Sequence, residues 1–420
     1  MQRAQAILSD KFISGNFLMF FGAMFLNAGG YIYHFLMIRF LGPQDYGALA
    51  ALFSILYILI APAMVLNAVV VRFVAQAFGR DDIDFIASFF SQLTRYIFLI
   101  GGTITLVFIA ASAQIGHFLN IANTGSVMIV GATSLFLFAT MFNRSIFQGL
   151  TRFGIFTLSG IMETVLKVVL ALTFVAIGFS VFGAIGGILI ADAAVFITTF
   201  VLLKIHFAQN NTQLKLPFGE IIRFTIPVFF SLVAMTSFYS TDIILVKHFF
   251  SPLEAGYYAF LALAGKIIFF VSSSVVMVMF PMVAQKKERG EKYTKYFLLT
   301  LLSILVISGS AILIYFFFPE LIVFLFQRSE YLAVAPLLGI FGVFILLFAL
   351  CWAAVNFFLS IGLVKISILP IIFAVLQVIG IWFFHGSLLE VIKVSIISLS
   401  LLLSCLLLYF AHAKTYNKIH

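Results

Sequence analysis

Residues 39–47 read Arg39-Phe-Leu-Gly-Pro-Gln-Asp-Tyr-Gly47, and the chain returns to this pattern 209 positions later as His248-Phe-Phe-Ser-Pro-Leu-Glu-Ala-Gly256. The same offset aligns Val74-Ala75-Gln76 with Val283-Ala284-Gln285, and Arg80 with Arg289, without an insertion. About a quarter of the aligned positions are identical, more than twice what chance gives in so apolar a chain. The offset is close to half of the 420 residues. The sequence therefore predicts a duplicated, two-lobed protein.

The composition places this duplication in a membrane. Hydrophobic residues make up 63% of the chain, charged residues only 9%, and the mean hydropathy is +1.20. A water-soluble protein of this size would aggregate with such a composition. A spanning helix requires about 20 apolar residues, so the chain has room for about twelve spans and for no sizeable domain outside the membrane. We predict an all-α polytopic membrane protein.

Polar residues divide the sequence into apolar runs that predict the spans. The runs cover residues 13–40, 48–76, 85–111, 124–147, 154–177, 183–207, 219–249, 256–284, 295–317, 335–360, 362–383 and 388–411. Six runs fall in each half, so both halves enter the membrane from the same side and form parallel repeats. We predict an N-terminal six-helix lobe over 1–208, a cytoplasmic interlobe linker over 209–218 and a C-terminal six-helix lobe over 219–420.

Basic residues are concentrated in alternate connections between the runs. One set of connections holds Arg80, Arg152, Lys204, Lys215, Arg223, Lys286, Lys287, Arg289, Lys292, Lys295, Lys365, Lys414 and Lys418. The opposite set holds chiefly Arg39, Lys247, Arg328 and Lys393. By the positive-inside rule, both termini are predicted to be cytoplasmic in a multi-pass protein of the inner cell membrane. The net charge of +9 is spread over these short loops, so it indicates topology, and no nucleic-acid partner is expected.

The connection 285–294 is the most basic of these loops. A solvated loop that sets the topology is the preferred interpretation, and contact with anionic lipid headgroups is the alternative. Membrane lipids are expected partners of the chain in general.

Several cations lie deeper within the predicted spans, where a charge normally faces a bundle interior or a wet cavity. Arg72, Arg95 and Arg144 lie toward the cytoplasmic ends of three successive runs. Snorkelling to headgroups explains each of them singly, whereas together they would form a funnel suited to a phosphate or pyrophosphate. Lys266 lies about ten residues into its run, with no acidic residue three or four positions away. We predict that Lys266 lines a transport cavity.

The carboxylates within the spans are candidates for ion pairing or for coupling to an H+ or Na+ gradient. Glu163 and Lys167 are four residues apart on one helix face and can pair, with Lys167 a further candidate cavity cation. Asp192 in the next run is a possible third member. Asp242 could pair with Lys266 or bind a coupling cation. Structural ion pairing is the alternative to a transport role for each of these carboxylates.

Motifs of catalysis and cofactor binding are absent from the sequence. There is no Walker loop and no Cys/His cluster at metal-ligand spacing, so no catalytic residue, metal or cofactor is expected. The external loops are short, and the largest, around 319–336, is mostly apolar. Membrane glycosyltransferases and polymerases generally need a sizeable polar external loop, which disfavours an enzyme.

The order of several motifs resembles a known family. The segment 39–47, followed by an apolar run ending in Arg72-Phe-Val-Ala, resembles the first helical hairpin of the polysaccharide biosynthesis exporters. These are the Wzx-like oligosaccharide flippases of the multidrug/oligosaccharidyl-lipid/polysaccharide (MOP) exporter superfamily. The resemblance continues in Gln148-Gly149-Leu-Thr-Arg152-Phe153 and from Asp242 through Ala255-Gly256-Tyr257-Tyr258 to Lys266.

This resemblance implies a MATE-like fold with two six-helix lobes around a cationic cavity. It also implies that the substrate is an undecaprenyl-diphosphate-linked oligosaccharide, moved from the cytoplasmic to the external leaflet for a polysaccharide polymerase machinery. The small number of cavity cations is a departure from the family, so pyrophosphate alone or a weakly anionic glycan would be recognised. The alternatives are a cation-coupled multidrug exporter of the same superfamily, disfavoured because residues 13–40 contain no acidic residue, and a membrane glycosyltransferase or polymerase.

Overall fold

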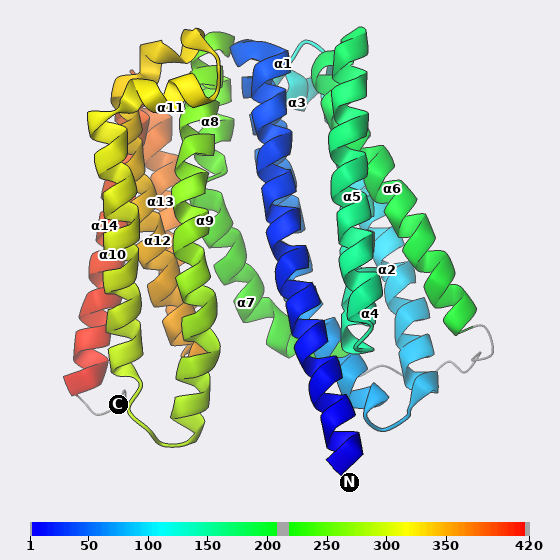
Figure 1. Cartoon of the computed structure of the whole chain (residues 1–420). Coiled ribbons are helices and arrows are strands. Elements are labelled where there is room, and N and C mark those ends of the chain that lie inside the picture. Colours follow the sequence, from blue (N-terminus) through cyan, green and yellow to red (C-terminus); the bar gives the residue numbers. More distant parts are fainter. Residues whose placement is uncertain (1, 208–217, 416–420) are drawn as a thin grey trace. The chain divides into compact units, whose positions relative to one another are not determined.

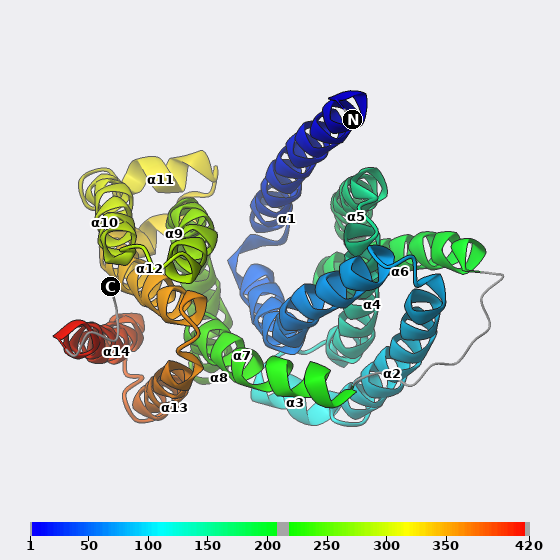
Figure 2. The ribbon, with the colours of Figure 1, turned by 90° about the horizontal axis from the view of Figure 1, so that it is seen from below.

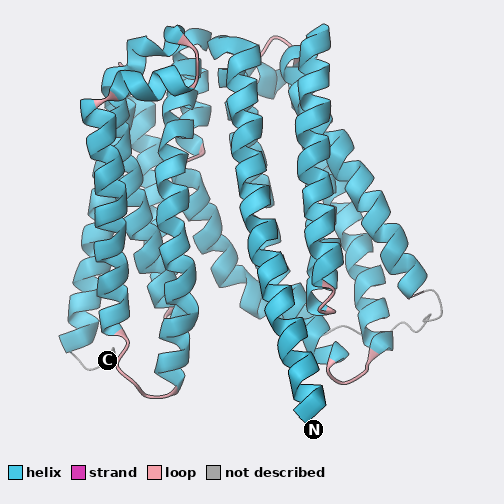
Figure 3. Ribbon diagram, in the orientation of Figure 1, coloured by secondary structure: helices cyan, strands magenta, loops and turns pink. Residues whose placement is uncertain are grey.

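The structure is a computed structural model that describes residues 2–207 and 218–415, and every regular element in these ranges is a helix (Figure 1, Figure 3). The prediction of an all-α protein is confirmed. Of the predicted linker 209–218, only Phe218 lies within the described residues.

The number of membrane-spanning helices also agrees with the prediction. Within the described residues, nine helical stretches are long and apolar enough to cross a membrane. Two of them, Met24–Phe78 and Phe153–His206, contain 55 and 54 residues, enough for two crossings each. Phe229–Phe238 and Thr241–Phe249, which meet at a bend of 42°, are together long and apolar enough for one more crossing. These stretches provide about twelve crossings in the described part of the chain.

The helices belong to two compact units, and the first contains residues up to Leu41 together with Leu59–Thr225. Its elements are α1 (Gln2–Phe78, shared with the second unit), α2 (Ile83–Ala110), α3 (Ser112–Phe118), α4 (Thr124–Gly149), α5 (Phe153–Phe174), the π-helical turn η1 (Val175–Phe179) and α6 (Ser180–His206). Helix α4 packs against α2, α5 and α6 (Figure 2). Its Phe142 and Phe147 are buried with Phe89, Phe90 and Phe196 in an aromatic core.

The second unit contains Gly42–Ile58 and the chain from Ile226 onward. Its elements are α7 (Phe218–Phe238, shared with the first unit), α8 (Thr241–Phe249), α9 (Pro252–Glu288), α10 (Thr294–Phe317), α11 (Pro319–Leu325), η2 (Ser329–Leu337), α12 (Leu338–Ser360), η3 (Val364–Ser367), α13 (Ile368–Phe383) and α14 (Leu388–Thr415). Helix α12 packs against α9, α10 and α14. The apolar segment 319–336, predicted as an external loop, forms the short helices α11 and η2 (Figure 1).

The repeated motif provides the helix boundaries at the start of each copy. In the first copy, Gly42 breaks the long helix α1 with a φ of +76°, a value that glycine adopts without steric cost. In the second copy, Ser251 caps α9: its hydroxyl accepts a hydrogen bond from the Glu254 N–H, and the Glu254 carboxylate accepts one from the Ser251 N–H. Pro252 occupies the first turn of the helix, where no N–H is needed. Both breaks coincide with the motif that revealed the duplication.

The units differ from the predicted lobes because residues 42–58 group with the C-terminal half. The two motif copies touch each other there: a Cβ on Gly47 would lie 2.6 Å from the backbone nitrogen of Gly256, and a Cβ on Gly256 would overlap the Pro43 carbonyl. Gly47 and Gly256 are equivalent positions of the repeat. The duplicated helices therefore contact each other at their own equivalent glycines, which a division at the middle of the chain does not anticipate.

Lys247 also ties residues 42–58 to the second unit. The sequence placed this lysine among the cations of external loops, but its side chain is 2% exposed within α8. It interacts electrostatically with Asp45 of the first motif copy. A buried ammonium needs such compensation because its desolvation is costly. Lys247 is therefore a packing residue of the second unit.

Candidate functional site

Lys266 is the centre of the most unusual polar site in the second unit. It lies on α9 and is half-buried. Its ammonium lies 4.6 Å from the centroid of the Tyr57 ring and 5.6 Å from that of Tyr239. A cation near an aromatic face is attracted to the ring by about 0.5–2 kcal/mol, depending on its desolvation. The two tyrosines therefore compensate part of the cost of removing this charge from water.

Asp242 supplies the opposite charge. Its side chain on α8 is 1% exposed and interacts electrostatically with Lys266. One carboxylate oxygen accepts a hydrogen bond of 2.8 Å from the Tyr258 hydroxyl, and the other accepts one of 2.8 Å from the Ile243 N–H. The structure thus brings Asp242 and Lys266 together, as their sequence positions suggested, and the hydrogen bond from Tyr258 of α9 links the two helices.

A break in the helix precedes this carboxylate. Helices α7 and α8 meet at a 42° bend around Tyr239, which frees backbone carbonyls from helical hydrogen bonds. The side-chain amide of Gln377 on α13 donates to the Phe238 carbonyl at 3.1 Å and to the Ser395 hydroxyl of α14 at 2.8 Å. Gln377 is 1% exposed. The broken span is therefore held by a buried amide, and the bend places Tyr239 beside Lys266.

Aromatic side chains continue from Lys266 across the second unit. The Tyr239 ring lies 5.3 Å from Phe348 of α12. Phe269 of α9 lies 4.9 Å from Phe348 and 6.1 Å from Trp352. Tyr57, Tyr239, Phe269 and Trp352 are all half-buried. Lys266 is thus bordered by an aromatic surface that keeps partial access to the surroundings.

The first unit contains a second charged group, built from three helices. The Arg144 guanidinium on α4 forms a salt bridge of 3.0 Å with Glu163 on α5 and lies 4.8 Å from the Phe156 ring. Gly160 makes room for it, because a Cβ there would lie 2.6 Å from a guanidinium nitrogen. Glu163 therefore pairs with Arg144 across helices, and not with Lys167 four residues away as the sequence suggested. Helix α5 turns Glu163 toward α4, and spacing along one helix does not reveal a partner on another.

Asp192 on α6 belongs to the same group. It is 1% exposed and interacts electrostatically with Glu163, Lys167 and Arg144. Neither of its carboxylate oxygens accepts a hydrogen bond within the described residues. A buried carboxylate without hydrogen-bond donors is costly. The structure therefore brings together Arg144, Glu163, Lys167 and Asp192 and leaves Asp192 the least satisfied member.

Replacing Arg144 with methionine is expected to lower the free energy of unfolding by up to about 3–5 kcal/mol, because it leaves the partly buried Glu163 carboxylate without its partner. The double variant Arg144→Met/Glu163→Gln should recover part of the loss, since no uncompensated charge remains at that pair. Thermal unfolding in detergent measures both. Arg95→Met, at an exposed arginine, is the matched control and should change stability little. Equal small effects of Arg144→Met and Arg95→Met would contradict a structural role of the pair.

The other predicted cations take different positions. Arg72 on α1 and Arg95 on α2 are exposed, whereas Arg144 is 9% exposed and engaged with Glu163. The three arginines therefore do not share one environment, as a common phosphate funnel would require. No group of three or more metal-ligating side chains occurs among the described residues.

Three residues of the Lys266 site were not identified from the sequence as site residues: Tyr239, Tyr258 and Gln377. Tyr258 lies eight positions before Lys266, which places both on one face of α9, so a helical pattern could have indicated it. Tyr57 occupies the repeat position equivalent to Lys266, and the structure shows that the two equivalent side chains meet. Nothing in the sequence signals that Gln377 reaches the break between α7 and α8.

Comparison with known families gives a match that covers most of the chain. The sequence profile of a family described as polysaccharide biosynthesis protein matches residues 36–336, which is more than half of the chain. This range includes both copies of the repeated motif and every charged residue of the Lys266 and Arg144 groups. Comparison with curated proteins gives no significant match.

Solved structures share the fold at low sequence identity. An inward-facing multidrug resistance MATE family transporter of the MOP superfamily has a TM-score of 0.73 and 16% identity, over 93% of this chain and 96% of the other. Lipid II flippase MurJ in an inward closed conformation has a TM-score of 0.72 and 13% identity, over 95% of this chain and 87% of the other. The MATE multidrug transporter DinF-BH has a TM-score of 0.69 and 16% identity, over 96% of this chain and 95% of the other. The chain belongs to the polysaccharide biosynthesis protein family and is a multi-pass membrane protein with the MATE-like fold of the MOP superfamily.

Proposed function

We propose that the protein is a flippase that moves a polyprenyl-diphosphate-linked oligosaccharide, on undecaprenyl diphosphate, from the cytoplasmic to the external leaflet for surface polysaccharide biosynthesis. Membership of the polysaccharide biosynthesis family supports a glycan pathway, and the MOP-superfamily fold supports transport by alternating access. We further propose that the protein lies in the inner cell membrane with both termini in the cytoplasm, and that it delivers its substrate to a polysaccharide polymerase machinery.

The observation that carries this proposal is the pairing of one half-buried ammonium with an aromatic surface. The Lys266 ammonium can bind a phosphate oxygen by a charge-assisted hydrogen bond. The half-buried rings of Tyr57, Tyr239 and Trp352 offer flat apolar faces on which sugar rings can stack. A diphosphate-linked sugar cannot cross hydrocarbon unaided, because burying its charges there is prohibitively costly. A site with one cation and several aromatic faces meets both needs of the headgroup and requires no catalytic residue.

Energy for transport is proposed to come from an H+ or Na+ gradient. Asp242 and Asp192 are both 1% exposed, and each interacts electrostatically with a cation of its own unit. Binding of a proton or sodium ion to either carboxylate would remove charge compensation from Lys266 or from the Arg144 group. A coupling ion bound to Asp242 would thus act on the Lys266 site of the second unit. A coupling ion bound to Asp192 would act on the Arg144 group of the first unit.

Loss of the protein in the organism that encodes it tests the proposal. We expect the surface polysaccharide to disappear and the polyprenyl-linked unit to accumulate on the cytoplasmic side, where it is protected from externally added glycan-modifying enzymes. Restoration by the wild-type chain is the control. Unchanged surface glycan together with raised sensitivity to cationic dyes would overturn the proposal in favour of a cation-coupled multidrug exporter. Sugar transfer by the purified chain would instead indicate a glycosyltransferase or polymerase.

A further inference from the structure

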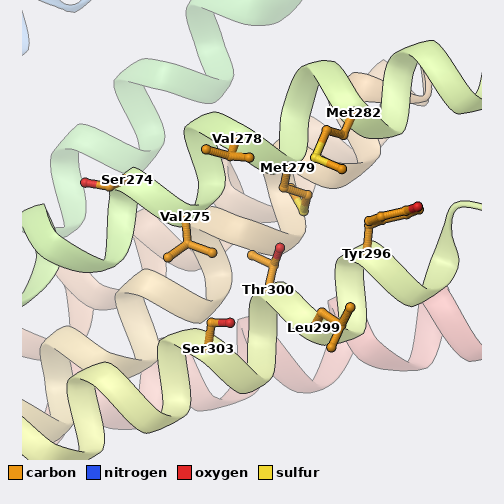
Figure 4. A pocket seen from close by; sticks show the side chains of 9 residues that line it. All are labelled: Ser274, Val275, Val278, Met279, Met282, Tyr296, Leu299, Thr300 and Ser303. Atoms are coloured by element: carbon orange, nitrogen blue, oxygen red, sulfur yellow. The ribbon is translucent and has the colours of Figure 1, made fainter. Parts of the chain in front are cut away.

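An apolar groove lies between α9 and α10 of the second unit, away from the Lys266 site. Its volume is about 390 Å³, and its walls come from both helices (Figure 4). Val275, Val278, Met279 and Met282 of α9 face Leu299 and the other α10 residues across it. Val278 and Leu299 are 59% and 54% exposed. Such exposed apolar side chains between two spanning helices are typical of a surface that contacts lipid chains.

Cations lie at the end of the groove nearest the α9–α10 loop. Tyr296 lines the groove. The Lys286 ammonium lies 5.5 Å from the centroid of the Tyr296 ring, and the Lys295 ammonium lies 5.3 Å from it. The hydrogen bond from Lys286 lowers the pKa of the exposed Glu291 carboxylate. An exposed pair of this kind contributes little stability, so an anionic ligand can compete for the lysine.

The repeated hairpin does not by itself require the α9–α10 loop to be basic. Residues 286–295 contain five basic and two acidic residues. The equivalent residues of the first copy, 77–86, contain one basic and three acidic residues. Both loops join the same pair of helices in their own halves and, as parallel repeats, are predicted on the same side of the membrane. Topology alone therefore does not explain why only the second loop is strongly basic.

We propose that the α9–α10 groove binds an anionic phospholipid, with an acyl chain between the two helices and the phosphate beside Lys286 and Lys295. The apolar walls match a hydrocarbon chain, and the two ammonium groups match a phosphodiester at headgroup level. Lys287 is directed elsewhere, because its ammonium donates a hydrogen bond of 2.6 Å to the Ile361 carbonyl. This proposal is independent of the transported substrate.

Native mass spectrometry of the purified full chain from vesicles of phosphatidylglycerol and phosphatidylcholine tests the proposal. We expect the wild type to retain phosphatidylglycerol in preference to phosphatidylcholine. At about 1 kcal/mol per lysine, Lys286→Ala/Lys295→Ala should weaken phosphatidylglycerol binding about 30-fold and leave phosphatidylcholine unchanged. The control Lys204→Ala/Lys365→Ala removes two exposed lysines elsewhere and should retain the preference.

A second pair of variants tests the apolar part of the site. Val278→Trp should fill the groove and reduce retention of both lipids, whereas Leu302→Trp, at a residue that is 57% exposed on the same helix pair but outside the groove, should not. Full phosphatidylglycerol retention by the double-lysine variant, or by Val278→Trp, would overturn the proposal. Selective displacement of phosphatidylglycerol by a polyprenyl diphosphate would also overturn it, because the groove would then belong to the transported substrate.

Discussion

Replacing Lys266 with alanine is expected to abolish restoration of surface polysaccharide in a strain that lacks the protein, while the variant still accumulates in the membrane. The ammonium is the cationic group of the aromatic site formed with Tyr57 and Tyr239. Hydrogen bonds to charged groups contribute about 1.5–3 kcal/mol, so loss of the ammonium should weaken binding of the diphosphate roughly 10- to 100-fold. Export of the polymer and the amount of membrane-inserted protein, measured together, check this result.

Two further variants separate charge from packing. Lys266→Met keeps the length of the side chain and removes the charge, so it should fail like the alanine variant. Lys266→Arg keeps the charge and should retain part of the activity, reduced because a planar guanidinium fits the two rings differently. Lys393→Ala removes an exposed lysine of α14 and should behave as wild type. Normal polysaccharide export by Lys266→Met would remove the ammonium from the mechanism.

The sequence predicted the elements of this fold because each span carries its own signal. Apolar length identifies a spanning helix wherever it occurs, and the repeated motif at residues 39–47 and 248–256 directly precedes the second and eighth predicted spans. Lys266 stood out for an equally local reason, since a charge within an apolar run is visible without knowledge of its neighbours.

The sequence did not predict which helices contact each other. Residues 42–58 belong to the N-terminal repeat in sequence and to the second unit in space. The Arg144–Glu163 pair, the interaction of Lys247 with Asp45 and the hydrogen bond from Gln377 to the α7–α8 break are likewise contacts between different helices. Helix periodicity gives the face on which a residue lies, but the partner of that face depends on tertiary packing.

The contact between the two motif copies makes Gly256 a position at which one methyl group should have a large effect. A Cβ at Gly256 would overlap the carbonyl oxygen, the carbonyl carbon and the Cα of Pro43. All three are backbone atoms that no rotamer change can move. Gly256→Ala should therefore separate α9 from residues 42–58 and lower the free energy of unfolding by about 1–3 kcal/mol or more. Because Tyr57 follows on the same segment, the variant should also disturb the Lys266 site. Thermal unfolding and polysaccharide export measure the two effects.

Gly309→Ala is the matched control, because it makes the same substitution in helix α10 where a Cβ would meet no atom within 4 Å. Alanine is the better helix former by up to about 1 kcal/mol, so this variant should be as stable as the wild type or more stable. One substitution is thus expected to act with opposite signs at two helical glycines. If Gly256→Ala unfolded at the wild-type temperature, α9 and residues 42–58 would not be in backbone contact, and the grouping of this segment with the second unit would lose its physical basis.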